Sequence, residues 1–349
     1  MKKKLRIAQV APLWFPVPPK KYGGTERIIS FLTEGLVKKG HKVTLFAPGD
    51  SKTKAKLVAL IKKGIISLGA TWKEFWWDIF NHSVAFQRAK EFDIIHCHWN
   101  LMGAFFQRFI KTPVVHTLHN IPSPSNLRWQ IIKEYKNDIR AVFISKSEKR
   151  NSVVKFKHSW VVYNGINLSD FKFNPKPKNH FIWIARICPA KGTKEAIEIA
   201  KKAKIKLLLA GQIQPHYRQY FEKEIKPRLT STIKYVGELP KEKLSKFYGS
   251  AKGCLYPIHW EEPFGLIMTE SMACGTPVIV FDKGSAREVV KDGKTGFIVN
   301  NIKEAVEAIK RINEIDRKKC REWVEENFTK EKMVDNYEKL YYEILKKSS

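Results

Sequence analysis

The feature of this sequence that most constrains its fold is a repeated alternation of short apolar runs with amphipathic stretches. Apolar runs bounded by turn residues indicate buried strands, whereas apolar residues at every third or fourth position indicate helices. Strands that alternate with helices form parallel sheets whose two faces are covered by those helices. The fold class predicted from this pattern is α/β.

The pattern occurs as two series, which predicts two doubly wound α/β domains. The first series contains a helix at 25–40 and strands at 5–13, 42–49, 93–99, 112–119 and 141–145. The second contains helices at 193–204, 215–228, 241–252 and near 264–273, and strands at 180–186, 205–211, 233–239, 253–258, 276–282 and 296–300. A Pro- and Lys-rich stretch at 174–178, of the kind found in linkers, separates them. We expect domains at 1–173 and 174–329, with ligands bound outside the carboxyl ends of the strands, facing across the inter-domain cleft.

The chain carries a formal net charge of +30, from 64 Lys and Arg residues against 34 Asp and Glu residues. Such a field attracts polyanions such as nucleic acid, an anionic membrane or phosphorylated ligands, although a surface of solvated lysines explains it equally well. A nucleic-acid module usually adds a motif to its charge, and the sequence has no zinc-finger spacing and no RNP-like aromatic strand. We therefore expect no specific nucleic-acid partner.

The cellular location is predicted from the cysteines and from the lengths of the apolar runs. Five cysteines lie scattered without a C-x-x-C pair, which is typical of reduced thiols in a cytoplasmic protein. Residues 1–16 read as a first strand, with a signal peptide as the alternative. No run approaches the roughly 18 apolar residues of a membrane-spanning helix. The expected location is cytoplasmic, with peripheral contact at the inner face of an anionic membrane as a further hypothesis.

A first candidate for ligand binding is the glycine pair between the first predicted strand and the first predicted helix. Gly23 and Gly24 let the backbone approach a ligand closely, and the free N–H groups of the helix start suit an anion. An ordinary turn capped by Thr25 is the alternative. The chain lacks a G-x-G-x-x-G fingerprint, which disfavours a dinucleotide oxidoreductase.

A second candidate consists of two cations at the start of the second series. Arg186 ends the predicted strand at 180–186, and Lys191 directly precedes the predicted helix at 193–204. Two cations beside a helix start suit a diphosphate. Solvated basic side chains are the alternative, so the argument depends on position rather than residue type.

Four histidines lie at the carboxyl ends of two predicted strands, namely His96, His98, His116 and His119. They could form a zinc site, but catalytic zinc sites usually include or neighbour a carboxylate, and none follows closely here. A structural role for His96 and His116 is favoured. We expect His98 and His119 to face the cleft.

The stretch from His259 to Asp282, HWEEPFGLIMTESMACGTPVIVFD, places two carboxylates around a Pro-Phe-Gly turn. We predict that residues 263–264 begin a helix whose N–H groups at Gly265 and Leu266 meet a sugar or phosphate. A carboxylate accepts two hydrogen bonds and so suits a pair of vicinal hydroxyls. Glu262 in the loop and Glu270 about two turns into the helix would hold two hydroxyl pairs; a capped helix with one exposed acid is the alternative.

These motifs together resemble the retaining GT-B glycosyltransferases of family 4, and the resemblance covers nearly the whole chain. The E-x7-E motif from Glu262 to Glu270 is quite specific, and residues 22–51, 162–171 and 284–299 also match. The resemblance implies a GT-B fold of two Rossmann-like domains, with an acceptor domain at 1–173 and a donor domain at 174–329. The last helix, within 330–349, would pack back onto the first domain.

The resemblance also implies an activity in carbohydrate or glycolipid biosynthesis. A hexose would move with retention from a UDP- or GDP-sugar to a hydroxyl of a sugar, lipid or other acceptor, with no metal or other cofactor. Catalytic roles are implied for His119 beside the transferred sugar, for Arg186 and Lys191 at the diphosphate, and for Glu262 at the donor sugar. Donor binding is implied for Gly23, Gly24, Gly211, Val236, Gly237, Phe264, Gly265, Leu266 and Glu270, with Glu270 on the ribose and 236–237 near the base. The acceptor side would include His98 and Trp99.

The expected mechanism is departure of the sugar through an oxocarbenium-like state while cations stabilise the leaving diphosphate. No carboxylate is placed as a nucleophile, so attack from the same face is expected. The acceptor is not predicted: residues 53–80 mix Lys with Leu, Ile and three Trp, which suits either a membrane surface or a packed helix pair. The alternatives to a transferase are a GT-B nucleotide-sugar epimerase, which needs no acceptor, and a non-catalytic basic protein that binds membrane or nucleic acid.

Overall fold

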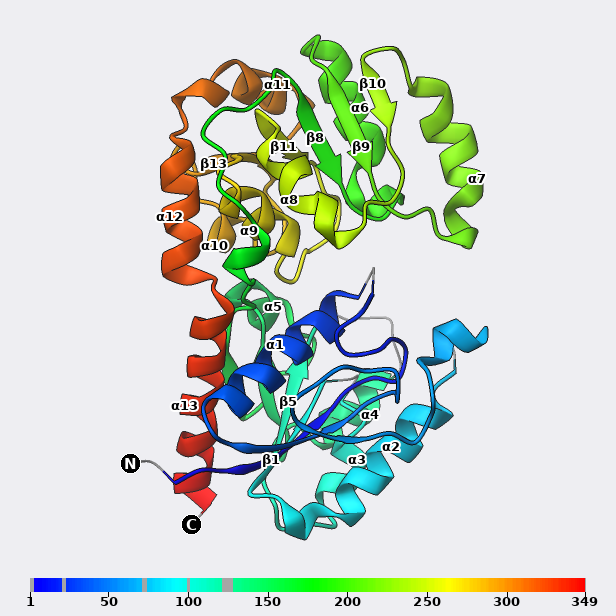
Figure 1. Cartoon of the computed structure of the whole chain (residues 1–349), viewed down its shortest axis with the longest axis vertical. Coiled ribbons are helices and arrows are strands. Elements are labelled where there is room, and N and C mark those ends of the chain that lie inside the picture. The colour runs from blue at the N-terminus through cyan, green and yellow to red at the C-terminus, as the bar shows by residue number, and fades with distance from the viewer. Residues whose placement is uncertain (1–2, 21–22, 71–73, 99–100, 121–127, 349) are drawn as a thin grey trace. The chain divides into compact units, whose positions relative to one another are not determined.

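The structure is a computed structural model that describes residues 3–20, 23–70, 74–98, 101–120 and 128–348 (Figure 1). The chain divides into an N-terminal unit, Met1–Gly165 with Lys330–Ser349, and a C-terminal unit, Ile166–Thr329. The division falls eight residues before the expected boundary at 173/174. Residues 166–173 pack on the C-terminal unit, where the Phe171 ring contacts that of Tyr248 edge-on at 6.2 Å and the Lys172 N–H donates to Ser245.

The N-terminal unit contains a sheet of seven described strands, all paired in parallel, in the order β3-β2-β1-β4-β5-β6-β7. The strands are β1 (Arg6–Val10), β2 (Lys42–Phe46), β3 (Lys56–Val58), β4 (Ile94–Cys97), β5 (Val114–Leu118), β6 (Arg140–Phe143) and β7 (His158–Val161). The helices are α1 (Gly24–Lys38), α2 (Trp76–Gln87), α3 (Ala104–Gln107), α4 (Arg128–Glu134), α5 (Lys146–Asn151) and the C-terminal α13 (Lys330–Ser348). The central strands are buried along their length, which agrees with helices on both faces.

The C-terminal unit contains a second parallel sheet, of six described strands in the order β10-β9-β8-β11-β12-β13. The strands are β8 (Phe181–Ile184), β9 (Leu207–Ala210), β10 (Ile233–Tyr235), β11 (Gly253–Tyr256), β12 (Val278–Phe281) and β13 (Gly296–Val299). The helices are α6 (Thr193–Lys202), α7 (Arg218–Tyr220), α8 (Lys241–Gly249), α9 (Leu266–Ala273), α10 (Ala286–Val289), α11 (Ile302–Lys310) and α12 (Arg317–Asn327). The predicted α/β class and its two parallel sheets are confirmed.

Every predicted strand is present, but two strands and two helical segments differ from the prediction. Strands β3 and β7 were not predicted. Both are edge strands with incomplete burial, although the apolar runs at 57–61 and 160–163 overlap them. The predicted helix at 215–228 is helical over its whole length, but its hydrogen bonding changes from 3₁₀ to α to π, at Phe221–Ile225, and back to 3₁₀, at Lys226–Arg228. Pro227 in the last of these cannot donate a backbone hydrogen bond. The helix pair considered for 53–80 is wrong, since this segment contains β3, a 3₁₀ turn at Ile65–Leu68 and the start of α2.

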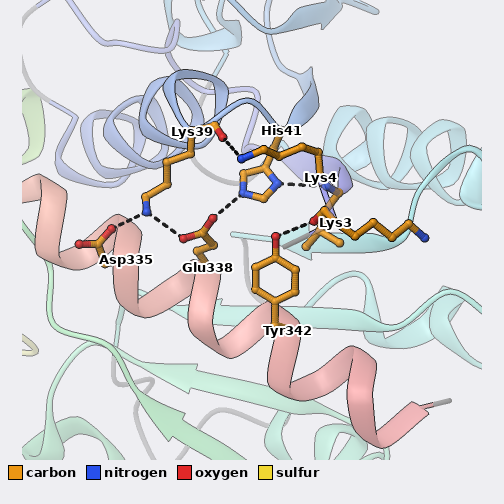
Figure 2. Close-up of polar contacts among 8 residues, drawn as sticks. Lys3, Lys4, Lys39, His41, Asp335, Glu338 and Tyr342 are labelled. Atoms are coloured by element: carbon orange, nitrogen blue, oxygen red, sulfur yellow. Dashed lines mark hydrogen bonds and ion pairs between the residues drawn. The ribbon is translucent and has the colours of Figure 1, made fainter. Parts of the chain in front are cut away.

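Helix α13 packs against α1 within the N-terminal unit. A Cβ atom added at Gly35 of α1 would lie 2.5 Å from Cγ2 of Val334. The side chain of Val334 on α13 therefore packs directly against the backbone of α1. At the far end of α13, the Tyr342 hydroxyl donates to the Lys3 carbonyl at 2.6 Å (Figure 2). The last segment of the chain is therefore fixed to the first.

Charged side chains strengthen this contact between α1 and α13 (Figure 2). The Lys39 ammonium lies 2.6 Å from Asp335 and 2.8 Å from Glu338, and the other carboxylate oxygen of Glu338 lies 2.9 Å from Nε2 of His41. The backbone N–H of Leu5 donates to Nδ1 of His41, so Nε2 carries the proton that is donated to Glu338. The buried His41 thus joins β1, α1 and α13.

In each sheet the order of strands reverses once, between β1 and β4 and between β8 and β11. Open parallel sheets bind ligands at the carboxyl ends of the strands beside such a reversal. Each unit therefore has one position where the fold itself favours a site. No helix among the described residues combines the length and the apolarity needed to cross a membrane.

Candidate functional site

The best-formed cluster of functional side chains lies in the C-terminal unit, at the ends of β8 and β11. A short 3₁₀ turn at Pro189–Lys191 follows β8, and Lys191 is its last residue before α6. The Lys191 ammonium lies 2.5 Å from Oε2 of Glu262, which stands in the loop after β11. Only 9% of Lys191 and 7% of Glu262 is exposed, so this ion pair is nearly removed from water.

Glu262 receives two further hydrogen bonds on the same oxygen. The Tyr256 hydroxyl donates at 2.5 Å and the indole N–H of Trp260 donates at 3.0 Å. Burial, and then the charge of Glu262, raises the pKa of Tyr256 well above its usual value, so the hydroxyl keeps its proton. The Lys191 ammonium also lies 4.4 Å from the centre of a Trp260 ring, in cation–π contact. Three donors therefore hold one carboxylate oxygen in a fixed place.

Two glycines allow these loops to approach one another. Gly192 has φ +69°, and a Cβ there would lie 1.8 Å from the carbonyl oxygen of Pro257. Gly284 has φ +57°, and a Cβ there would lie 2.2 Å from the carbonyl oxygen of Glu262. The next residue, Ser285, donates its N–H to that same carbonyl at 2.9 Å. Side chains at either glycine would displace the backbone that carries Lys191 or Glu262.

Glu270 lies about one turn inside α9 and is also buried. Its Oε2 accepts a 2.8 Å hydrogen bond from Tyr248 at the end of α8, and burial followed by the Glu270 charge raises the pKa of that tyrosine well above its usual value. Helix α9 begins at Leu266, with Gly265 as its N-cap at φ +76°. The prediction that residues 263–264 begin the helix is therefore wrong, because the left-handed Gly265 separates them from it. The alternative of an exposed acid fails too, since both glutamates are buried.

The remaining predicted donor residues of this unit lie at the ends of β8, β9 and β10. Arg186 follows β8 and donates from Nη1 to Oε1 of the buried Gln214 at 3.4 Å. The N–H of Gly211 donates to the Gly237 carbonyl at 3.0 Å, which brings the loops after β9 and β10 together. Val236 stands in the second loop with 42% of its surface exposed, an unusual position for a large aliphatic side chain.

In the N-terminal unit, the predicted glycine pair lies where it was expected. Gly23 is the N-cap of α1 at φ +142°, and Gly24 is the first helical residue. Trp99, predicted for the acceptor side, lies outside the described residues. Gly23 and Gly24 lie beyond the carboxyl end of β1, where the strand order of this sheet reverses.

His96, His98 and His119 belong to a buried hydrogen-bond network. His96 uses Nδ1 toward the Tyr341 hydroxyl and Nε2 toward the Thr117 hydroxyl, both at 2.7 Å. His98 uses Nε2 toward Gln9 at 2.6 Å and Nδ1 toward His119 at 3.3 Å. Both nitrogens of His96 and of His98 are engaged in hydrogen bonds, and the part of the chain that the structure describes contains no cluster of three or more metal-ligating side chains.

Burial controls the charge of these histidines. It lowers the pKa of His119 to about 4 and the pKa values of His96 and His98 well below their usual value, with smaller contributions from the neighbouring rings in the last two. Burial also lowers the pKa of His116, to about 3. All four rings are neutral at pH 7, which is consistent with the structural role predicted for His96 and His116.

Some residues of the cluster were not predicted from the sequence. Tyr256 precedes the predicted stretch and Trp260 lies within it, and nothing in the sequence distinguishes them from other aromatics; only their contact with the Glu262 carboxylate does. Tyr248 and Gln214 contact their partners from 22 and 28 positions away, so no local pattern indicates them. A weak signal exists for 284–285, because a Gly-Ser pair shortly after a buried strand often marks a tight turn.

Two family models match the chain and together span the motifs described above. Residues 22–170 match Glycosyltransferase Family 4, and residues 167–330 match Glycosyl transferases group 1. The chain belongs to the family 4 glycosyltransferases. The resemblance noted from the sequence is thereby confirmed, and the enzyme is a transferase of the glycosyltransferase class.

Individual proteins agree with this family. An uncharacterized glycosyltransferase of Methanocaldococcus jannaschii, MJ1607, is 24% identical to this glycosyltransferase over 334 residues, which is 83% of this chain and 85% of the relative. The solved structure of a sucrose-phosphate synthase from Thermosynechococcus elongatus superposes with a TM-score of 0.81 at 21% identity, over 98% of this chain and 99% of that one. HepE of Anabaena, solved in complex with UDP and glucose, superposes with a TM-score of 0.74 at 17% identity, over 97% and 100%. These likenesses show the GT-B fold.

Proposed function

We propose that this glycosyltransferase moves a hexosyl group, with retention of configuration, from a UDP- or GDP-sugar to a hydroxyl of an acceptor. The observation that carries the proposal is the buried pair of Lys191 and Glu262 at the strand-order reversal of the C-terminal unit. A buried cation held beside a helix start suits a diphosphate, whose charge grows as the sugar leaves.

Lys191 and Arg186 are assigned to the diphosphate. Both stand between β8 and α6, where the helix start adds the partial positive charge of its N–H groups. Without a ligand, Glu262 neutralises Lys191, which reduces the cost of keeping an ammonium nearly out of water. A diphosphate would add a stronger partner for the same cation.

Glu262 is assigned to the donor sugar as a hydrogen-bond acceptor and not as a nucleophile. Its Oε2 accepts hydrogen bonds from three donors, and each of them lowers the nucleophilicity of that oxygen. In the step that we propose, the bond between the anomeric carbon and the diphosphate oxygen breaks, and the acceptor oxygen bonds to the same face of that carbon. The proton of the acceptor hydroxyl passes to the leaving diphosphate, so charge and atoms balance.

The other roles follow from the positions of the residues. Glu270 is assigned to the ribose, where its carboxylate would accept from vicinal hydroxyls while Tyr248 holds it. The base is assigned to the loops that carry Gly211 and Val236–Gly237, and the backbone of Phe264–Leu266 is assigned to the sugar with Glu262. In the N-terminal unit, His119 beside the transferred sugar, Gly23 and Gly24 at the donor, and His98 and Trp99 at the acceptor remain predictions.

Known proteins support the choice of donor. The HepE structures contain UDP, UDP with glucose, and UDP-glucose. A nucleotide sugar is therefore the donor class to test first. A cytoplasmic location, where such donors are made, is part of the proposal.

The proposal is tested by product analysis with UDP-glucose, UDP-N-acetylglucosamine and GDP-mannose, each alone and with a pool of sugar and lipid acceptors. We expect one donor to release its nucleoside diphosphate faster when acceptors are present, and the Lys191→Met variant to lose this release. A 2-epimer of the sugar, formed without any acceptor, would instead indicate the epimerase. No turnover of any donor by a folded wild-type protein would count against an enzyme of this class.

We further propose that the described residues of the segment 53–80, namely 53–70 and 74–80, contact an anionic membrane surface. Four aromatic side chains at the start of α2 are exposed, with 46% of Phe75, 68% of Trp76, 40% of Trp77 and 48% of Phe80 accessible to solvent. Exposed lysines at 52, 54, 56, 62 and 63 precede them. Tryptophan beside Lys is the composition of segments that lie at the interface of anionic bilayers.

Flotation with vesicles of phosphatidylglycerol and phosphatidylcholine tests this contact. We expect the protein to float with the anionic vesicles at low salt, and the Trp76→Ser/Trp77→Ser variant to remain at the bottom. Phe109→Ser is the matched control, because Phe109 is 84% exposed but lies outside this segment. Equal flotation of both variants, or none by the wild type, would contradict the proposal.

A further inference from the structure

A continuous chain of hydrogen bonds crosses the N-terminal unit from its last helix to His119. It begins at Tyr341 on α13, passes through Gln9 on β1 and His98 after β4, and ends at His119 after β5. The separations are 3.1 Å from Tyr341 to Gln9, 2.6 Å from Gln9 to His98 and 3.3 Å from His98 to His119. Residues 332 positions apart in the sequence thus belong to one network.

The direction of each hydrogen bond follows from the chemistry of the groups. Gln9 donates from its amide nitrogen to the Tyr341 oxygen, so its carbonyl oxygen faces His98 and can only accept. Nε2 of His98 must therefore carry the proton of that ring. Because the ring is buried and neutral, its Nδ1 is an acceptor, and Nε2 of His119 must be the donor.

A second branch of the network agrees with this direction. The Tyr341 oxygen accepts a hydrogen bond from the Gln9 amide. The Tyr341 hydroxyl can therefore donate its own hydrogen to Nδ1 of His96, at 2.7 Å. Nε2 of His96 then donates to Thr117, whose hydroxyl lies 2.9 Å from that of Tyr337 on α13. Each of the His96 hydrogen bonds then pairs one donor with one acceptor, so the two branches do not conflict.

The position of α13 is itself well determined. Its charged residues Asp335 and Glu338 are paired with Lys39, and Tyr342 is bonded to the first described residue of the chain (Figure 2). Tyr341 therefore joins the network from a helix whose adjacent turns are held in place by these contacts. A fixed acceptor at one end, the Tyr341 oxygen, defines the orientation of the groups that follow it.

We propose that Tyr341 and Gln9 are positioning residues that set, through His98, the ring orientation of His119 and its Nε2–H tautomer. Nδ1 of His119 is then its acceptor, so the group that this nitrogen recognises is a hydrogen-bond donor such as a sugar hydroxyl. The last part rests on the proposed function, in which His119 lies beside the transferred sugar. The tautomer itself does not depend on that function.

The test is a pair of matched tyrosine variants, read by nitrogen chemical shifts in protein labelled with ¹⁵N-histidine. The signals of His119 are identified by their loss in His119→Asn. We expect wild-type His119 to show a protonated Nε2 and an unprotonated Nδ1 at pH 7.5. Tyr341→Phe removes the acceptor that orients Gln9, so the amide can turn over and both His119 nitrogens should move toward averaged values.

Tyr337→Phe removes an equivalent hydroxyl from the same helix but leaves the chain from Tyr341 to His119 intact, so His119 should keep its wild-type signals. Gln9→Leu, which removes the link directly, should reproduce the effect of Tyr341→Phe. A protonated Nδ1 in wild-type His119, or equal shifts in Tyr341→Phe and Tyr337→Phe, would overturn the proposal. If the Gln9 variant does not fold, the tyrosine pair still decides.

Transfer assays then connect the network to function. Tyr341→Phe should lower kcat/KM about tenfold, the expected effect of losing one hydrogen bond, while Tyr337→Phe stays near the wild-type value. If no donor is turned over at all, the proposed function fails but the nitrogen shifts still test the network. If transfer occurs and the His119 tautomer differs from that expected, the network proposal alone is wrong.

Discussion

The ion pair of Lys191 and Glu262 allows the roles of its two members to be separated. Lys191→Met removes the cation and keeps the length of the side chain, and Glu262→Gln removes the carboxylate and keeps its shape. The proposed roles predict different ligand dependences. Loss of Lys191 should weaken both the free nucleoside diphosphate and the nucleotide sugar, whereas loss of the Glu262 charge should weaken the nucleotide sugar only.

The size of each effect follows from the contacts. A charge-assisted hydrogen bond contributes about 1.5 to 3 kcal/mol, so Lys191→Met should raise the Kd of the diphosphate about 10- to 100-fold. In Glu262→Gln the ammonium is no longer neutralised, so the Kd of the free diphosphate should stay level or fall. The Kd of the nucleotide sugar should rise about tenfold, for one hydrogen bond to a charged group.

Stability provides an independent measure of the same pair. Removing one partner from a buried ion pair costs about 3 to 5 kcal/mol, because the other charge stays buried. In Lys191→Met, Glu262 keeps the donors of Tyr256 and Trp260, so we expect the lower end, about 3 kcal/mol. The double variant should recover part of this loss, giving a coupling energy above about 1 kcal/mol.

The assay is isothermal titration with UDP and UDP-glucose, or with GDP and GDP-mannose, combined with urea unfolding. Lys194→Met is the matched control, since this lysine lies three residues further along and forms a half-exposed pair with Glu224 at 3.0 Å. The control should change neither affinity, and its stability should change by less than about 1 kcal/mol. Equal affinities of Lys191→Met and wild type for the diphosphate would refute the assignment.

Three further predictions concern stability and metal dependence. Arg317 donates to the carbonyls of Asn174, Gly249 and Ala251, so Arg317→Met should lower the free energy of unfolding by about 3 kcal/mol in urea titrations, and a loss below about 1 kcal/mol would contradict this. Stability should peak near pH 6.5, because below that pH unfolding is favoured by protonation of buried histidines whose pKa values are lowered, namely His82, His96, His98, His116 and His119. Three buried carboxyls have pKa values raised to about 7, 7 and 8, namely Glu26, Asp78 and Glu148, so their ionisation favours unfolding as the pH rises from their usual pKa range to about 8. Glu26→Gln should remove the part of this loss that falls between about pH 4.5 and 7 in a midpoint-against-pH curve, and an unchanged curve would contradict the cause. Transfer should persist in excess EDTA, because Arg186 and Lys191 supply the positive charge, and recovery of lost activity by Mg²⁺ or Mn²⁺ would show that the cations are insufficient.

The sequence determined the parallel sheets well because their strands are buried on both faces and so form continuous apolar runs. It placed Arg186 and Lys191 after β8 and Glu262 after β11, because in a doubly wound fold the ends of the strands can be recognised along the chain. It did not indicate β7, an edge strand whose residues are exposed or half-buried although the apolar run at 160–163 overlaps it.

The sequence could not specify how those side chains pair. Whether Glu262 meets Lys191 depends on the packing of two loops 71 positions apart. The contact of Tyr341 with Gln9 depends on the return of α13 to the first strand, and no local pattern encodes it. The same limit applies to the boundary between the units, where the side chains of 166–173 rather than the Pro-rich stretch decide which unit they join.

The measurement that tests the central claim most directly is thermal unfolding with UDP, GDP, ADP and CMP in turn, at about millimolar concentration, for wild type and Lys191→Met. A ligand that binds only the folded protein raises the unfolding midpoint. The account predicts that UDP or GDP raises the midpoint of the wild type, that CMP with its single phosphate does not, and that Lys191→Met loses most of the rise. Midpoints that no diphosphate changes, or a rise that Lys191→Met retains in full, would contradict it.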